Sequence, residues 1–96
     1  MVKITWWASY AGGITVTAKG HADGSPEFCA MISALLGAWS FVCDERNGTV
    51  REESGDYYAH CKDGVESYAA LRAILGGLRR VQEIGPEFIC IENTHI

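Results

Sequence analysis

The sequence predicts an α+β domain in which two main helices pack on a mostly antiparallel sheet. The hydrophobic residues switch several times between the alternating spacing of a strand and the three-to-four-residue spacing of a helix. They predict the order strand, strand, helix, strand, strand, helix, strand, and paired strands separated by helices are typical of this class. With 96 residues, 48% of them hydrophobic, the chain fits a single domain over residues 1–96.

A hairpin is predicted at the start of the chain. Apolar residues alternate with polar ones over residues 2–8 and again over 14–19, and the glycines near residues 11–13 supply the turn. Trp6 and Trp7 are neighbours in the first strand, so they point to opposite faces of the sheet. One can enter the core, and the other either lies half-exposed or belongs to a self-association surface.

The first helix is predicted over residues 26–44. It follows a loop at residues 20–24, with Ser25 as N-cap and Pro26 at the first helical position, where proline is tolerated. One apolar face follows at spacings of three and four. That face consists of Phe28, Ile32, Leu35, Trp39 and Val42.

Two further strands are predicted after the first helix. Asn47-Gly48 marks the helix end, and residues 49–53 and 57–62 read as strands around a turn at 54–56. They form a second hairpin.

The second helix is predicted to start near Asp63 and Glu66, which resemble a capping box. Gly85 suits the left-handed C′ position, Pro86 cannot continue the helix, and residues 88–92 form the last strand. The apolar face of this helix consists of Tyr68, Leu71, Leu75, Leu78 and Val81.

Two adjacent glycines, Gly76 and Gly77, lie inside the second helix. Glycine is less favourable than alanine there by about 1 kcal/mol. We therefore predict that another backbone approaches closely, with the first helix near Gly37-Ala38 as the candidate.

The net charge and the composition of the chain limit the classes of partner that it can bind. A net charge of −4 and a pI of about 5.2 argue against general nucleic-acid binding. We expect no membrane span, because no stretch is long enough to cross a bilayer, and a cytoplasmic location, because residues 1–6 begin like a strand rather than a signal peptide.

The four cysteines form no CxxC pair, which fits free thiols in a reducing compartment. No zinc-ligand spacing is present, so we expect neither a metal nor a cofactor. We expect Cys43, Cys61 and Cys90 to be inert small hydrophobic residues.

Cys29 falls in the first turn of the first helix. Helical side chains lean toward the N-terminus, so its sulfur should face unpaired backbone amides, and the helix dipole favours the reactive thiolate. His21 precedes it by a short loop that can fold back over the helix start. A thiol beside an imidazole that takes its proton is an activated nucleophile, and free amides at the helix start can hold an oxyanion.

Three residues are candidates to support this pair. Ser33 lies one turn after Cys29, where its hydroxyl can bond the thiolate, orient a substrate carbonyl, or bond back to the Cys29 carbonyl. Asp23 and Glu27 can orient His21, although Glu27 equally suits a favourable first-turn charge. By spacing alone, a surface histidine and a structural cysteine account for the same residues.

The motifs Gly20-His21-Ala22 and Cys29-Ala30-x-x-Ser33-Ala34-Leu35 resemble the signature of the ribosomal-processing cysteine proteases, the Prp family. The segment Glu53-Ser54-Gly55, and the pattern around Gly77-Leu78 and Pro86, are similar to the central hairpin and the C-terminal part of the same family. The resemblance covers nearly the whole chain, but the first two motifs are its specific part.

The resemblance implies a small homodimeric protease that removes an N-terminal extension from a protein of the large ribosomal subunit. It implies Cys29 as nucleophile, His21 as base and Ser33 as a supporting residue. This chain departs from the better-known members in a shorter loop between His21 and Cys29. Pro26 and Glu27 stand where those members carry an aspartate. The loop is the natural lid, so its length points to a different peptide or to a fold kept without activity.

Three functions follow as expectations. The first is a cysteine endopeptidase that acts on a ribosomal protein N-terminus or a related peptide. The second is a catalytically silent binding module of the same fold. The third, which we rank lower, is a thiol redox sensor in which another cysteine resolves oxidised Cys29.

Overall fold

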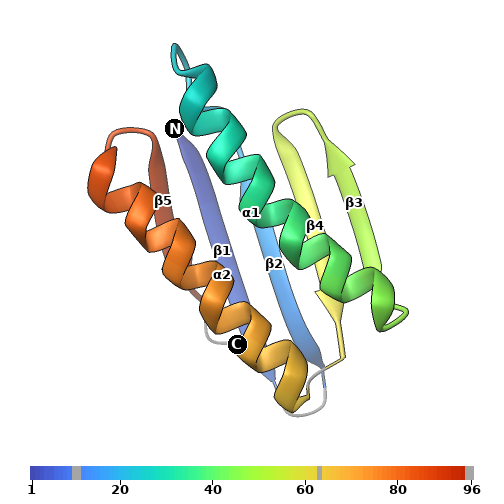
Figure 1. The fold of residues 1–96 in the computed structure, drawn as a ribbon. Coiled ribbons are helices and arrows are strands. Elements are labelled where there is room, and N and C mark those ends of the chain that lie inside the picture. Colours follow the sequence, from blue (N-terminus) through green and yellow to red (C-terminus); the bar gives the residue numbers. More distant parts are fainter. Residues whose placement is uncertain (10–11, 63, 95–96) are drawn as a thin grey trace.

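A computed structural model describes residues 1–9, 12–62 and 64–94 and shows a five-stranded sheet covered by two helices (Figure 1). The element order is the predicted one. The elements are β1 (Val2–Ser9), β2 (Gly13–Lys19), α1 (Pro26–Glu45), β3 (Thr49–Glu53), β4 (Asp56–Cys61), α2 (Val65–Ile84) and β5 (Ile89–Asn93).

The strands lie in the order β3-β4-β2-β1-β5. The three pairs β1–β2, β2–β4 and β3–β4 are antiparallel, whereas β5 is parallel to β1. The prediction of a mostly antiparallel sheet is therefore confirmed, and the parallel edge pair makes the sheet mixed. The parallel pairing of β5 with β1 arises because the chain leaves β4, passes through α2 and returns on the far side of β1 (Figure 1).

Both helices cover one face of the sheet, and the core lies between them and that face (Figure 1). Strand alternation supplies the apolar floor, including the fully buried Ile4 and Ile14. From the helix side, Trp39 is fully buried and its Nε1 donates a hydrogen bond to the Ala59 carbonyl at 3.2 Å. A buried indole needs such a partner, so this bond ties the middle of α1 to β4.

The opposite face of the sheet carries no helix. There Trp7 is half-buried and pairs with Thr15 across the strands. The Thr15 Oγ1 lies 2.7 Å from the His60 Nδ1, and Thr15 is only 2% exposed. Trp6 instead packs partly against the core on the helix side. The two tryptophans therefore lie on opposite faces as predicted, and self-association through Trp7 stays a prediction.

Both ends of α1 follow the sequence signals. Ser25 is the N-cap, its Oγ accepts a hydrogen bond from the Phe28 amide, and Pro26 opens the helix. At the other end Asn47 takes a positive φ of 57°. The Gly48 amide then donates to the Cys43 carbonyl at 2.8 Å, which closes the helix as a left-handed C-terminal turn does.

The caps of α2 differ from the predicted ones. Asp63 lies outside the described residues, and the N-cap is Gly64, which makes no side-chain cap bond. Glu66 pairs with Arg46 at 3.5 Å. At the other end Gly85 has a φ of −136°, so the predicted left-handed conformation is wrong.

Gly85 is needed for space rather than for its backbone angle. A Cβ at this position would run into the ring of Phe28. That ring packs against Phe88 with a centroid distance of 4.7 Å. The aromatic pair therefore joins the start of α1 to the end of α2.

The prediction that another backbone approaches the two glycines inside α2 was wrong. A Cβ on Gly77 would lie 2.7 Å from Cδ2 of Leu35, so a side chain of α1 approaches there, not a backbone. A Cβ on Gly76 or on Gly37 would meet nothing within 4 Å. Only Gly77 thus makes room for helix packing.

We expect Gly77→Leu to lower the melting temperature, because the new side chain must displace Leu35 in a packed interface. Overpacking of this kind typically costs about 1–3 kcal/mol. The matched variant Gly76→Leu enters open space and should stabilise α2 by roughly 0.5–1 kcal/mol. Thermal unfolding of both variants measures the contrast, and equal melting temperatures would contradict this packing.

In the part of the chain that the structure describes, α1 alone has the length and composition of a helix that could cross a membrane, with a mean hydropathy of 1.5. The expectation that no stretch is long and apolar enough was therefore wrong by this measure. The core helix of a soluble protein and a signal sequence near the N-terminus meet the same criterion. One face of α1, including Trp39, is buried against the sheet.

Candidate active site

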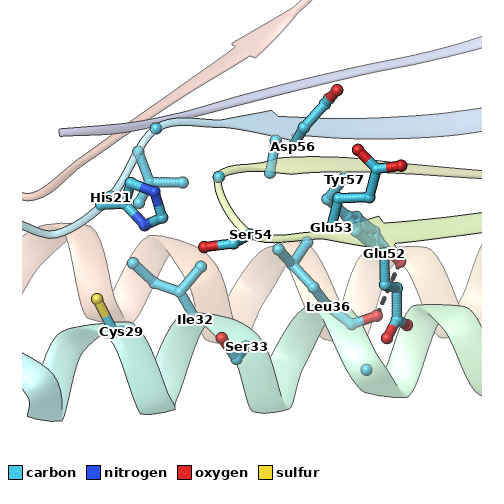
Figure 2. A pocket seen from close by; sticks show the side chains of 15 residues that line it. His21, Cys29, Ile32, Ser33, Leu36, Glu52, Glu53, Ser54, Asp56 and Tyr57 are labelled. Carbon is cyan, nitrogen blue, oxygen red and sulfur yellow. Dashed lines mark hydrogen bonds between the residues drawn. The ribbon is translucent and has the colours of Figure 1, made fainter.

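A cavity of about 250 Å³ lies between α1, the loop after β2 and the β3–β4 turn (Figure 2). It is smaller than the pockets that usually enclose a small molecule, which hold roughly 300–1,000 Å³. One wall is a stripe of α1 at spacings of three and four, and the floor comes from Val2 and Ala18 of the central strands. The α1 stripe consists of Cys29, Ile32, Ser33, Leu36 and Gly37.

His21 reaches the cavity because of two glycines. Gly20 takes a φ of +98°, and its amide donates to the Gly55 carbonyl at 3.0 Å, which holds the end of β2 against the β3–β4 turn. Gly55 itself has a φ of +73°. A Cβ there would lie 2.6 Å from the His21 Nε2, so the imidazole occupies the space that a side chain at residue 55 would need.

Cys29 lies in the first turn of α1 as predicted, but its sulfur contacts a carbonyl rather than free amides. The Sγ donates to the Ala22 carbonyl at 3.6 Å. Pro26 has no amide hydrogen, the Phe28 amide bonds to Ser25 Oγ, and the Cys29 amide bonds to the Ser25 carbonyl at 3.2 Å. Of the first-turn amides these contacts leave only that of residue 27 for a developing oxyanion.

The structure brings Cys29 and His21 to the same cavity. Cys29 comes from α1 and His21 from the loop after β2, and their side chains enter the cavity from opposite sides (Figure 2). Among the described residues no hydrogen bond joins them, and the Cys29 thiol donates to the Ala22 carbonyl instead. Contacts of a catalytic pair are often long before substrate binds, so this arrangement permits a dyad without displaying one.

The predicted supporting residues separate into two groups. Ser33 lines the cavity one turn beyond Cys29, and its exposed hydroxyl has no hydrogen-bond partner in the described part of the chain. It does not bond back to the helix. Asp23 and Glu27 are exposed and do not line the cavity, and Glu27 accepts a hydrogen bond from Ser25 Oγ at 3.3 Å. The contacts of Glu27 thus fit its alternative role at the helix start.

The β3–β4 hairpin forms the second wall of the cavity, and none of its residues had been nominated for the site from the sequence. Ser54 and Glu52 line the cavity opposite α1. The Glu52 Oε1 accepts a hydrogen bond from Ser40 Oγ at 2.5 Å, and Ser40 also lies 2.8 Å from the Tyr57 hydroxyl. The Tyr57 hydroxyl donates to the Leu36 carbonyl at 2.9 Å, and burial raises the pKa of Tyr57.

Strand alternation places Glu52 on the same face of β3 as Val50, the helix face. That signal was available in the sequence. The meeting of the hairpin with α1 was not, because it depends on the strand order.

The remaining cysteines lie away from the cavity. Cys43 and Cys61 are fully buried neighbours, and burial, reinforced by Cys61, raises the pKa of the Cys43 thiol. Cys90 is half-buried on β5. No disulfide joins the four cysteines, all of which are described. Raised thiol pKa values disfavour the reactive thiolate, which fits an inert structural role for Cys43.

Over residues 1–9, 12–62 and 64–94 no group of three or more His, Cys, Asp or Glu side chains is placed to hold a metal ion. The cavity contains one histidine, one cysteine and several carboxylates, but they do not gather at one point.

No protein-family model matches the sequence, and no curated protein matches it. Solved structures do resemble the fold. One is the essential ribosomal processing protease Prp of S. aureus in complex with a covalently linked product peptide, at 20% identity and a TM-score of 0.82, covering 98% of this chain and 100% of that chain.

The same protease in complex with a substrate peptide gives 19% identity and a TM-score of 0.80 over 98% and 100% of the two chains. SMU.848 from Streptococcus mutans gives 23% identity and a TM-score of 0.69 over 98% and 94%. The chain thus has the fold of these proteins along nearly its whole length.

Proposed function

We propose that this protein is a cysteine endopeptidase of the ribosomal-processing type, with Cys29 as nucleophile and His21 as base. The observation that carries the proposal is the common cavity of these two side chains, which enter it from α1 and from the loop after β2. The fold supports the proposal, because a ribosomal processing protease that binds peptides has a similar fold. The substrate class is an N-terminal extension of a large-subunit ribosomal protein or a related peptide.

The reaction begins when a bound peptide draws His21 and Cys29 together. His21 takes the thiol proton, and the Sγ attacks the scissile carbonyl carbon to form a tetrahedral oxyanion. The C–N bond then breaks, the leaving amine takes the proton from His21, and a thioester to Cys29 remains. Water, deprotonated by His21, hydrolyses the thioester and restores the thiol.

The Cys29 thiol must leave the Ala22 carbonyl before this step, because that contact holds its proton. Ser33 lines the same cavity one helical turn beyond Cys29, and its hydroxyl can orient the substrate carbonyl there. The Glu27 amide can stabilise the oxyanion at the positive end of α1.

We also propose a homodimer in the cytoplasm. The helix-free face of the sheet, which carries Trp7, offers a surface for a second copy (Figure 1). The four cysteines without disulfides fit a reducing compartment.

Alkylation of Cys29 by iodoacetamide tests the dyad. We expect rapid modification below pH 7 in the native protein and slow modification in His21→Ala, because the imidazole stabilises the thiolate. Mass spectrometry of digested protein, across a pH series, separates Cys29 from Cys90. An unactivated thiol becomes reactive only near pH 8.5, to within about a unit.

A catalytically silent binding module is the second candidate, and the Sγ contact with the Ala22 carbonyl favours it. For that function Cys29 should react like an ordinary thiol and His21→Ala should make no difference. This result, measured with a bound peptide as well as without one, would contradict the peptidase proposal.

A further inference from the structure

The cavity runs along the α1 wall as a groove, from Cys29 to Gly37. Gly37 lines it, and apart from its two chain neighbours and the nearby backbone of its own helix no atom lies within 4 Å of where its Cβ would be. A rise of about 1.5 Å per residue puts Gly37 roughly 12 Å along the helix from Cys29. An extended peptide covers about 3.3 Å per residue, so three to four substrate residues fit between these two points.

At this far end the groove reaches a carboxylate held in place. Figure 2 shows the Glu52 side chain reaching toward α1 near Leu36, whereas the carboxylates of Glu53 and Asp56 point to the other side of the hairpin. The Oε1 of Glu52 accepts the bond from Ser40, which is only 6% exposed. This fixed hydroxyl orients the carboxylate and leaves Oε2 available.

The charge of Glu52 has no counterpart in the described chain. The ion pairs there join other residues, with Lys19 on Asp56 as the pair closest to the hairpin turn. No lysine or arginine lines the cavity. A carboxylate that is held but not neutralised favours a cationic partner from outside the chain.

We propose that Glu52 is a specificity-determining residue that selects peptides with a lysine or arginine side chain about three to four residues from the scissile bond. The inference rests on the proposed function, because it places the reacting bond at Cys29. The peptide lies along α1, over Ser33 and Gly37, and its basic side chain pairs with the carboxylate of Glu52.

Thiol-reactive peptide probes test this inference without requiring catalysis. Each probe is a short Ala/Gly peptide with an iodoacetyl group at one end and lysine, norleucine or glutamate at the third or fourth position. Both directions are made, with the reactive group at the N-terminus or at the C-terminus. The rate of Cys29 modification is read by mass spectrometry of digested full-length protein.

We expect the lysine probe of one direction to modify Cys29 up to about five times faster than its norleucine counterpart, the factor that corresponds to an ion pair of about 1 kcal/mol. Glu52→Gln keeps an acceptor for Ser40 but should bring the ratio close to one. Glu52→Lys should favour the glutamate probe. Added salt should reduce the preference of the native protein.

Glu45→Gln is the matched control. It removes the same unit charge from the last residue of α1, outside the cavity, and should leave the lysine preference intact. A lysine probe that reacts no faster than norleucine, or a preference that persists in Glu52→Gln, would overturn the inference.

The experiments distinguish a failure of the proposed Cys29–His21 dyad from a failure of the proposed role of Glu52. Iodoacetamide reports whether His21 activates Cys29, whereas the probe ratio reports only what the groove recognises, since any accessible thiol can be alkylated. An inert dyad with a Glu52-dependent lysine preference would support the groove assignment and leave a silent peptide-binding module. An active dyad with no preference would overturn the role of Glu52 alone.

Discussion

Cys29→Ala should abolish peptide cleavage and leave the fold unchanged. The proposed reaction forms a thioester on this sulfur, so its loss removes every covalent step, and a loss on the order of 10⁶-fold is typical of a missing nucleophile. Stability should change little, because Cys29 is only half-buried and its one side-chain hydrogen bond is the 3.6 Å contact with Ala22.

The measurement is turnover of peptides that copy the N-termini of large-subunit ribosomal proteins, with circular dichroism to verify folding. Cys90→Ala is the control, since Cys90 is also half-buried but lies outside the cavity. Full activity in Cys29→Ala would exclude the proposed mechanism. Loss of activity in both variants would point to a general effect on the fold.

Gly55→Ala should lower activity on the order of 100-fold by displacing the imidazole of His21. The new Cβ would lie 2.6 Å from Nε2, and a displacement of about 1 Å in a catalytic group costs on that order. The φ of +73° adds backbone strain of roughly 1–2 kcal/mol for a residue with a side chain.

Gly24→Ala separates these two effects. Gly24 has a similar φ of +79°, but a Cβ there meets nothing within 4 Å. Both variants should therefore lose similar stability in thermal unfolding, whereas only Gly55→Ala should lose turnover and the His21-dependent alkylation of Cys29. Equal activity in the two variants would show that the contact of His21 with Gly55 does not position the base.

The local elements were readable from the sequence because their signals act over a few residues. Ser25 and Pro26 set the start of α1, and Asn47 at a φ of 57° sets its end. Alternation set the faces of the strands. Where a glycine could have two structural reasons, the prediction named the wrong one. Gly85 leaves space for the rings of Phe28 and Phe88 and does not form a left-handed turn. Gly77 leaves space for the Leu35 side chain rather than for a backbone.

For the candidate site too, the sequence nominated residues through local signals, and the tertiary structure decided which of them meet. Cys29 and His21 were nominated by the sequence, because a cysteine in a first helical turn after a short loop is a local arrangement. Ser33 followed from helical spacing and does line the cavity. Asp23 and Glu27 were nominated as carboxylates near His21 in the chain but do not line the cavity, because closeness in the chain does not determine on which side of the loop an exposed side chain lies.

The sequence by itself determined the order of elements, and it nominated Cys29 and His21 as the candidate pair, since both depend on periodicity or on neighbours along the chain. Only the tertiary structure decided that the β3–β4 hairpin stands beside α1, that Gly55 makes room for His21, and that Glu52 lines the cavity. Those contacts join residues far apart in the chain, and they depend on the strand order β3-β4-β2-β1-β5. That order follows from how the whole apolar surface is buried, which no local pattern encodes.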